Sequence, residues 1–436
     1  NFSLNNATTN TIDAAGLTST FSGSFSNTSN QTGTISIQDS VGGGSVIFSG
    51  ANTFTGPLNI GSGSFTLAAS GSLVAPANIS SGSTLNNFGL MNGAVNNASG
   101  GTVLNTGIIG GTISNSGTLN NNNGGIVSGV LTNNANGTVT NESQITNAVY
   151  NNGVFTNGIL GNITGNITNA QGGQFYNNSS APPAHTNTII NNGNFTNNAQ
   201  IYSTFINGGT GTVVNMGSMN DITNEVSGVI INSSGINNVT NNGTLYLNGN
   251  TAQIMGGITG TGTVQINGNF TQEAPISNGA INVAGTFSQY PLMGGVAETT
   301  ANSLSVGVAG YAAGSLNLLG NLTVGTAEIG GASGSTGVVN MQGGRFATGN
   351  LSVGYHGNGT LNLIGSTLSV GDGTGTLILA SQEQSIGTLN IGTASDPGFG
   401  ALQAGSIIGG AGTAILNFNY YGNYIFAPNI YDSVSV

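Results

Sequence analysis

Apolar and polar residues alternate along short stretches of this chain, as at Val46 and Phe48 and again at Leu361 and Leu363. An alternation of period two places every second side chain on one face of a β-strand. No stretch combines Ala, Leu, Glu and Lys with a 3.6-residue period, and β-branched residues, Gly and Asn disfavour a helix. The pattern therefore predicts an all-β protein with no helices of note.

A short phrase recurs through the alternating stretches: Gly, any residue, an apolar residue, any residue, Asn. It reads GTVLN at 101–105, GTVTN at 137–141 and GNFTN at 193–197. Successive copies are 15 to 20 residues apart and begin at Gly101, Gly117, Gly137, Gly153, Gly173, Gly193, Gly211, Gly228, Gly243 and Gly262. That spacing is typical of one coil of a solenoid, whereas a hairpin-based sandwich or barrel would show turn signals every 8 to 12 residues.

The repeat predicts a parallel β-helix, or β-solenoid, of roughly 20 coils and on the order of 100 Å in length. Its apolar centre should form the core. Strands stacked in register about 4.8 Å apart place Asn above Asn, so each side-chain amide can hydrogen-bond to the next. Gly and Asn are expected at the corners, because both tolerate a left-handed backbone.

Composition separates this chain from ordinary globular proteins. Only 3% of its residues are charged, against about a quarter in an average soluble protein. Low charge with much Gly, Ser, Thr and Asn is also typical of disorder, but disordered tracts lack the strand alternation seen here. Arg345 is the single Lys or Arg against twelve acids, for a net charge of −11, which excludes nucleic-acid binding and basic attraction to a membrane.

Two observations favour an exported, extracellular protein. The chain has no cysteine, and its single Lys or Arg leaves trypsin-type proteases almost no cleavage point. It also holds no apolar run near the roughly 20 residues of a transmembrane helix. The sequence opens at Asn1 without Met or a charged leader. We therefore expect a mature product or an excised segment, with no membrane insertion.

The amino-acid composition of the repeat changes along the chain, but no Pro-rich or charged linker separates the parts. Residues 1–79 are rich in Ser, Thr and Gly, residues 80–250 are dominated by Asn, and residues 251–436 carry phrases such as LNLIG. We expect one continuous rod of three stretches. Pro182 and Pro183 cannot donate to a ladder, so together with His185 they mark a protruding loop within Ser179–Thr188.

Candidate chemistry is sparse. His185 and His356 are far apart in sequence, and no Gly-x-Ser-x-Gly elbow occurs. Asp221 and Glu225 are four residues apart and would share one side of a strand, as paired carboxylates of a polysaccharide-cleaving enzyme must, but a polar exterior pair is the favoured interpretation. An isolated GDGTG at 371–375 is expected to be a turn rather than a calcium site. We predict no enzyme activity, no cofactor and no metal.

One aromatic group stands out near the end of the sequence. It comprises Phe418, Tyr420, Tyr421, Tyr424, Phe426 and Tyr431. Two interpretations stay open: a packed coil, or a surface for end-to-end or lateral assembly with another copy. Because an uncapped coil exposes unpaired backbone, head-to-tail stacking of such coils would make a fibre.

The segment SVIFSGANTFTGPLNIGSGSFTL at Ser45–Leu67 resembles the passenger-associated transport repeat of bacterial autotransporters. Phe54 falls on its aromatic position. The phrases at Gly314–Gly325, Gly337–Gly354 and Gly359–Gly371 look like the Leu-x-Val-Gly repeats of the same passengers. The resemblance covers roughly the first sixth and the last third of the chain, and the Asn-rich middle matches only in style.

The autotransporter resemblance implies a right-handed parallel β-helix, export through the outer membrane, and a role in adhesion, aggregation or scaffolding. Three functions therefore stay open from the sequence. The first is a structural or adhesive element that meets a host or neighbour-cell surface, the second is a self-assembling fibre subunit, and the third and least favoured is a polysaccharide-active enzyme.

Overall fold

The structure is a computed structural model that describes residues 1–5, 9–29, 31–180, 187–272, 274–290, 298–308, 313–392, 400–419 and 424–436. These residues form an almost purely β-stranded, parallel β-solenoid of about 20 coils. The chain divides into two compact units, Asn1–Val213 and Val214–Val436. The predicted fold class is therefore confirmed, and each unit is described by itself.

The first unit winds its strands into three faces, with β1 (Phe2–Leu4) paired to β4 (Phe25–Asn27) at its start. The first face holds β2 (Asn10–Asp13), β5 (Ile35–Gln38), β8 (Leu58–Ile60), β11 (Ala77–Ile79), β14 (Val95–Asn97), β17 (Ile113–Asn115), β20 (Leu131–Asn133), β23 (Val149–Asn151), β26 (Ile167–Asn169), β28 (Thr188–Asn191) and β31 (Thr204–Asn207). The second face holds β3 (Thr18–Phe21), β6 (Ser45–Phe48), β9 (Ser64–Leu67), β12 (Thr84–Asn87), β15 (Thr102–Asn105), β18 (Thr118–Asn121), β21 (Thr138–Asn141), β24 (Val154–Asn157), β27 (Gln174–Asn177) and β29 (Asn194–Asn197). The third face has only short strands: β7 (Ala51–Asn52), β10 (Ser72–Leu73), β13 (Leu90–Met91), β16 (Ile108–Ile109), β19 (Ile126–Val127), β22 (Gln144–Ile145), β25 (Asn162–Ile163) and β30 (Gln200–Ile201).

The second unit has longer strands. After β32 (Thr212–Asn215), which contains the boundary, come β33 (Ser218–Met219), β34 (Ile222–Asn224), β35 (Val229–Asn232), β36 (Gly235–Asn241), β37 (Thr244–Leu247), β38 (Gln253–Thr259), β39 (Thr263–Ile266), β41 (Ile276–Val283), β43 (Glu298–Val306), β45 (Asn321–Ile329), β47 (Arg345–Val353), β49 (Thr367–Val370), β50 (Thr376–Leu379), β52 (Ala401–Gln403), β53 (Ser406–Gly409) and β55 (Asn429–Tyr431). A separate eight-stranded sheet holds β40 (Asn269–Gln272), β42 (Thr286–Gln289), β44 (Ala313–Leu318), β46 (Thr336–Met341), β48 (Asn358–Leu363), β51 (Ile386–Ile391), β54 (Thr413–Phe418) and β56 (Val434–Ser435).

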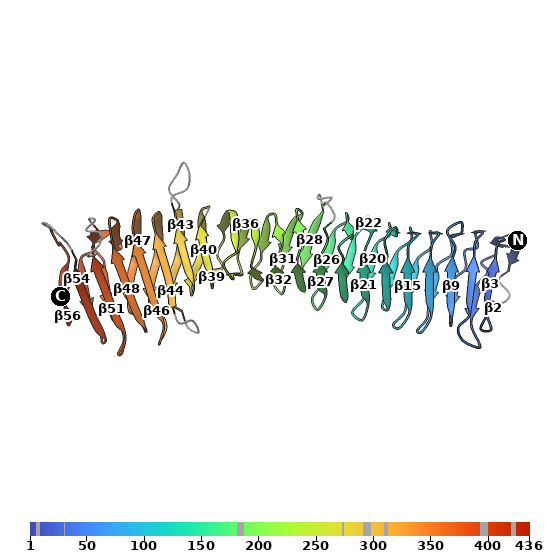
Figure 1. Ribbon diagram of the computed structural model, residues 1–436, viewed down its shortest axis with the longest axis horizontal. Helices are drawn as coiled ribbons and strands as arrows, with labels where there is room; N and C mark the ends of the chain where they lie inside the picture. Colours follow the sequence, from blue (N-terminus) through green and yellow to red (C-terminus); the bar gives the residue numbers. More distant parts are fainter. Residues whose placement is uncertain are drawn as a thin grey trace. The chain divides into compact units, whose positions relative to one another are not determined.

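Within each unit, equivalent strands of successive coils run parallel, as the strand arrows in Figure 1 show, and they pair in register apart from a shift within β36. Val103 lies between Leu85 and Leu119 in the ladder, for example. Register of this kind stacks like residues because a shift by one would turn every apolar side chain outward. The short phrase in the sequence is thus the unit of stacking.

The core is the apolar centre of the phrase, as predicted. Val103, Phe155 and Phe195 are fully or almost fully buried. Phe155, Phe175 and Phe195 stack face to face, with ring centroids 4.7 and 5.0 Å apart along the column. Aromatic pairs with this separation gain stability beyond the burial of their area.

Two buried columns of asparagine run through the first unit and confirm the predicted amide ladder. The first comprises Asn87, Asn105, Asn121, Asn141, Asn157, Asn177 and Asn197. The second comprises Asn97, Asn115, Asn133, Asn151, Asn169, Asn191 and Asn207. In both, each Nδ2 donates to the next Oδ1 at 2.7 to 3.1 Å. All the amides point the same way along the chain.

Each column has a defined beginning. In the coil before Asn87 the register partner is Leu67, and in the coil before Asn97 it is Ile79. Neither side chain can donate, so the buried Oδ1 atoms of Asn87 and Asn97 have no hydrogen-bond partner among the described residues. An unmade buried hydrogen bond costs about 1–3 kcal/mol. Each column has only one such unmade bond at its start, so in a long column its free-energy cost is small beside the many hydrogen bonds that are made.

The phrase glycines serve a different purpose from the one predicted. Gly101, Gly117 and Gly137 do not have positive φ, and no asparagine does among the described residues. A Cβ at Gly137 would lie 2.2 Å from Asn133 Oδ1 and 2.5 Å from the Asn115 carbonyl oxygen. The phrase needs glycine because the buried amide and the neighbouring coil fill that space. The left-handed corner is instead the preceding residue in several coils, as at Gly100.

In the second unit an asparagine column lies on the outside. The column comprises Asn317, Asn340, Asn362, Asn390 and Asn417, and each Nδ2 from Asn340 onward donates to the Oδ1 of the preceding asparagine. The interior column meanwhile becomes apolar, because Asn232 is followed in register by Leu247 and Ile266. Side-chain amides stabilise both units, but they are buried mainly in the first.

A carboxylate ties together two turns near the start of the chain. Asp39 Oδ1 accepts from Gly16 N at 2.7 Å and its Oδ2 accepts from Gly44 N at 2.6 Å. The Gly44 and Gly16 amides together hold the pKa of Asp39 below its ordinary value. Hydrogen bonds to the charged form have this effect.

We expect acid to loosen the turns at Gly16 and Gly44. A depressed carboxyl pKa contributes stability above the unfolded pKa, and that contribution is lost as pH falls through the folded value. Hydrogen-exchange mass spectrometry of peptides covering residues 14–44, corrected for intrinsic exchange, should show protection falling below the ordinary carboxyl range. Asp39→Asn should reduce this pH dependence to the part that comes from Asp13, whose carboxylate accepts from Ala15 N and Ser40 N, whereas Glu383→Gln, an exposed charge in the other unit, should preserve it. Equal pH profiles for all three proteins would contradict the assignment.

Candidate functional site

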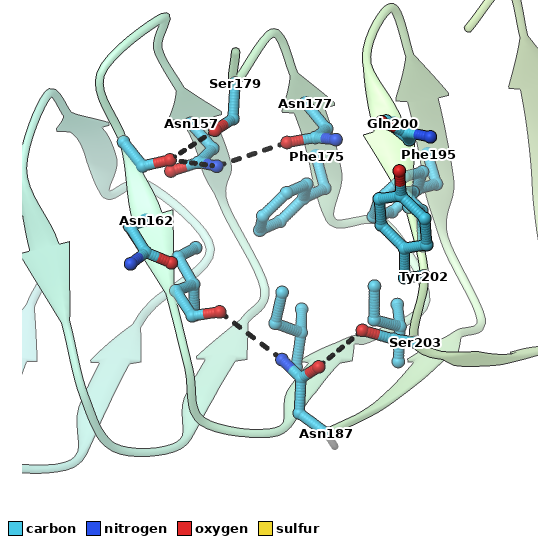
Figure 2. A pocket seen from close by; sticks show the side chains of 15 residues that line it. Asn157, Asn162, Phe175, Asn177, Ser179, Asn187, Phe195, Gln200, Tyr202 and Ser203 are labelled. Atoms are coloured by element: carbon cyan, nitrogen blue, oxygen red, sulfur yellow. Dashed lines mark hydrogen bonds between the residues drawn. The ribbon is translucent and has the colours of Figure 1, made fainter. Parts of the chain in front are cut away.

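A hollow lies beside the third face of the first unit, between β25 and β30. From β7 to β25, each short strand pairs with its predecessor in the seven-stranded sheet. Within the described residues 174–180 and 187–199, no strand of this face is present. The described side chains leave a hollow between Asn162 on one side and Gln200 on the other (Figure 2).

Side chains donate to the backbone carbonyls around β25. In the regular coils the carbonyls of Gly107 and Ile109 accept from the next rung's amides. Beside the hollow, Gly161 O accepts from Ser179 Oγ at 2.5 Å. Asn187 Nδ2 donates to Gly165 O at 2.7 Å and, at 3.4 Å, to Ile163 O. Polar side chains therefore satisfy these three backbone carbonyls.

The hollow itself is small. Phe175, Phe195, Ile167, Ile189 and Ile201 form its apolar lining. Figure 2 shows Asn187 below the rings, with its Oδ1 accepting from Ser203 Oγ. The volume is about 60 Å³, enough for a few waters but not for a sugar or a cofactor. No acidic or basic residue is part of its described lining.

The predicted protruding loop cannot be compared with the structure, because Pro182, Pro183 and His185 lie outside the described residues. The same holds for Tyr420 and Tyr421 of the aromatic group. The remaining predicted residues are described.

Three of the predicted aromatic residues come together. Phe418 contacts Phe426 edge-to-face, with ring centroids 5.1 Å apart, and Tyr424 lies 6.5 Å from Phe418. Tyr424 Oη also accepts from Leu402 N at 3.4 Å. Tyr431 sits on β55 with about half of its surface exposed. The arrangement leaves apolar surface at Phe418 and Tyr431 accessible to a partner.

The two candidate carboxylates flank one short strand. Asp221 and Glu225 are both exposed, immediately before and after β34. Asp221 Oδ1 accepts from the side-chain amides of Asn237 at 3.0 Å and Asn238 at 2.8 Å. Neighbouring amides thus bind the Asp221 carboxylate.

The second predicted histidine has one electrostatic neighbour. His356 packs edge-to-face on Tyr355, with centroids 4.4 Å apart. Burial raises the pKa of Glu328 above its ordinary value, and the charge of His356 opposes that rise.

The GDGTG segment forms a single 3-10 turn, η1 (Gly371–Gly373), closed by Thr374 N donating to Gly371 O. This turn agrees with the prediction.

Sequence reasoning missed a polar groove on the outside of the second unit. One hollow of about 420 Å³ is lined by Ser277, Thr300, Asn302 and Thr323. A second, of about 250 Å³, is lined by Glu298, Thr300, Thr323 and Arg345. Because Thr300 and Thr323 belong to both, the hollows form one groove. Only the register of long strands could show it, since its residues are about 23 apart in sequence.

Two searches of the described residues found nothing. No group of three His, Cys, Asp or Glu side chains in the described ranges could hold a metal ion. Among the same residues, no helix has the length and apolar character needed to span a membrane.

Comparison with protein-family models, curated proteins and solved structures gave no match. The fold alone therefore defines the class. The chain is a parallel β-solenoid stabilised by asparagine ladders.

Proposed function

We propose that this chain is a secreted, non-enzymatic β-solenoid with a structural and adhesive role at the bacterial cell surface or in the extracellular matrix. The observation that carries the proposal is the pair of buried asparagine columns. Asn133, for example, accepts from Asn115 and donates to Asn151, Gly137 O and Val154 O. The interior polar groups hydrogen-bond to one another, so they stabilise a regular stack of coils rather than form a reactive site.

The resemblance of Ser45–Leu67 to autotransporter passengers supports the location and the adhesive part. The described strands of that segment, β6, β7, β8 and β9, pair in parallel and in register with strands of neighbouring coils. Such a solenoid resists local opening because each coil is held by the coils on both sides. Resistance of this kind suits a protein exposed to extracellular proteases.

Surface location is the decisive test. An antibody against the purified chain should label intact cells, and protease treatment of intact cells should remove the label without lysis. Deletion of the gene should reduce attachment or cell–cell aggregation. Labelling only after lysis, or unchanged attachment, would contradict the proposal.

New reducing ends from incubated polysaccharides would favour the enzyme instead, and filaments in electron micrographs of the purified chain would favour the fibre subunit.

A further inference from the structure

The polar groove of the second unit follows the direction in which coils stack. In register, Ser277 lies beside Thr300, and Thr300 beside Thr323, on β41, β43 and β45. Neighbouring strands are about 4.8 Å apart, so a hydroxyl group recurs once per rung. We propose that this groove binds an uncharged, extended polysaccharide whose hydroxyl groups pair with the recurring side chains.

The side chains of this groove are free to bind a ligand. Ser277, Thr300, Asn302 and Thr323 are exposed, and none of these four side chains hydrogen-bonds to another described protein group. The exterior column on the neighbouring sheet differs, because Asn340 donates to Asn317 at 2.9 Å and accepts from the next rung. The asparagines of that exterior column therefore satisfy each other, whereas the four groove side chains make no hydrogen bond to another described group.

A hollow in the first unit also differs from the groove, because its polar side chains hydrogen-bond to one another. It has a volume of about 340 Å³ and is lined by Asn78, Asn96, Ser114 and Ser116, among others. There Asn96 donates to Asn78 at 2.8 Å, and both serines accept from a neighbouring asparagine. A hollow of similar size is thus already internally hydrogen-bonded, which sets the second-unit groove apart.

The chemistry of the lining selects a sugar. Hydroxyl and amide groups both donate and accept hydrogen bonds, as sugar hydroxyls do. Among the described lining residues, Ala301 and Val324 are the apolar side chains, so an apolar peptide or a lipid would find little area to bury. The floor includes Gly279 and Gly325, which bring the backbone within reach of a flat ring.

Charge selects a neutral sugar polymer. Glu298 pairs with Asn321 in register, and Arg345 N donates to Asn321 Oδ1 at 3.1 Å, so the groove carries one charge of each sign. The whole chain has a net charge of −11, which repels an acidic polymer at distances within the screening length of about 8 Å. Each charged side chain can make stronger, charge-assisted hydrogen bonds to sugar hydroxyls.

This inference deepens the adhesive part of the proposed function by naming its ligand class. The two can fail separately, because binding is measured with the purified chain and surface location with whole cells. A surface protein without glycan affinity would overturn only the inference. A glycan-binding chain found only inside cells would overturn only the proposed location.

Native affinity electrophoresis tests the groove with hydroxyethyl cellulose as the neutral probe and polygalacturonate as the acidic one. We expect hydroxyethyl cellulose to retard the chain, and the double variant Thr300→Val/Thr323→Val to weaken binding about tenfold or more, since it removes two ligand hydrogen bonds. Val keeps the shape of Thr and suits a strand. The matched control Thr360→Val/Thr388→Val, a register pair on β48 and β51, should bind like the parent chain.

Three results would overturn the proposal. They are no retardation by hydroxyethyl cellulose, equal weakening in the control pair, and retardation by polygalacturonate alone. Circular dichroism of both double variants shows whether each has kept its strand content, so a folding defect is distinguished from a lost contact.

Discussion

Asn133→Leu should destabilise the first unit by about 3 kcal/mol, because it breaks a buried amide column at its middle. Leu preserves most of the side-chain volume and occurs naturally in the other column at Leu67. The cost therefore comes from hydrogen bonds: Asn151 Oδ1 loses its donor, and Asn115 Nδ2 loses one acceptor. An orphaned buried group costs about 1–3 kcal/mol, and the lost bonds add to it. Urea unfolding followed by circular dichroism measures the change.

A double variant gives the sharper measurement. Asn133→Leu/Asn151→Leu interrupts the column over two adjacent rungs, yet it leaves only one broken end on each side, as the single variant does. The double variant should therefore cost less than the sum of the two single ones, because only the amide-to-backbone bonds of each rung are lost twice, and the double-mutant cycle should show strong coupling. Additive costs would mean that each amide contributes alone and that the ladder is not the stabilising unit.

The exterior ladder supplies the control. Asn96 donates to Asn78 at 2.8 Å, but the pair is exposed, so water replaces the bond when it is lost. Asn96→Leu should change the free energy of unfolding by no more than about 0.5 kcal/mol. If Asn96→Leu lowered the free energy of unfolding as much as Asn133→Leu, burial would not determine how much an Asn–Asn hydrogen bond contributes to stability.

Gly111→Ala should be the second severely destabilising change, costing about 3 kcal/mol or more. A Cβ at Gly111 would lie 2.1 Å from the carbonyl oxygen of Gly93, one coil earlier. The same crowding recurs at Gly129, where a Cβ would lie 1.9 Å from Gly111 O. Backbone atoms cannot move aside as a side chain can, so the coils must separate locally, and overpacking of this kind typically costs about 1–3 kcal/mol or more. Thermal unfolding and local hydrogen exchange should both report the loss.

The adjacent glycine is a matched control. A Cβ at Gly110 would meet the flexible side chain of Asn92 at 3.2 Å and no backbone atom closer than 3.6 Å. Neither Gly110 nor Gly111 has positive φ, so backbone strain does not separate them. Gly110→Ala should be neutral or stabilise slightly, because Ala restricts the unfolded chain. Equal destabilisation at both positions would show that crowding between coils is not the cause.

Much of this architecture follows from short-range patterns. The alternation at Val103 and Asn105 predicts one strand face, and recurrence of the phrase predicts stacking. The structure confirms both, because Val103 and Asn105 are buried on β15 and pair in register with Leu119 and Asn121 of the next coil. The amide ladder was predictable because register puts Asn above Asn once the strands are parallel.

The glycines and the groove were not predictable in this way. Whether Gly111 must lack a Cβ depends on how closely the carbonyl of Gly93 approaches, and that distance depends on how the chain bends at the corner between faces. The groove at Thr300 and Thr323 depends likewise on the bend within β43 and β45 and on side chains left unpaired. The periodicity of the sequence indicates neither how closely two coils approach at Gly111 nor which side chains of the groove stay unpaired.

The sequence by itself therefore determined the parallel solenoid, its core and its asparagine columns, because a repeated apolar–polar pattern admits only one register in which every apolar residue is buried. Only the tertiary structure decided which glycines are indispensable, which backbone carbonyls Ser179 and Asn187 satisfy, and where unpaired hydroxyls gather into a groove. These features arise between residues about 18 to 24 positions apart, and their geometry is fixed by contacts between coils rather than by the pattern within one.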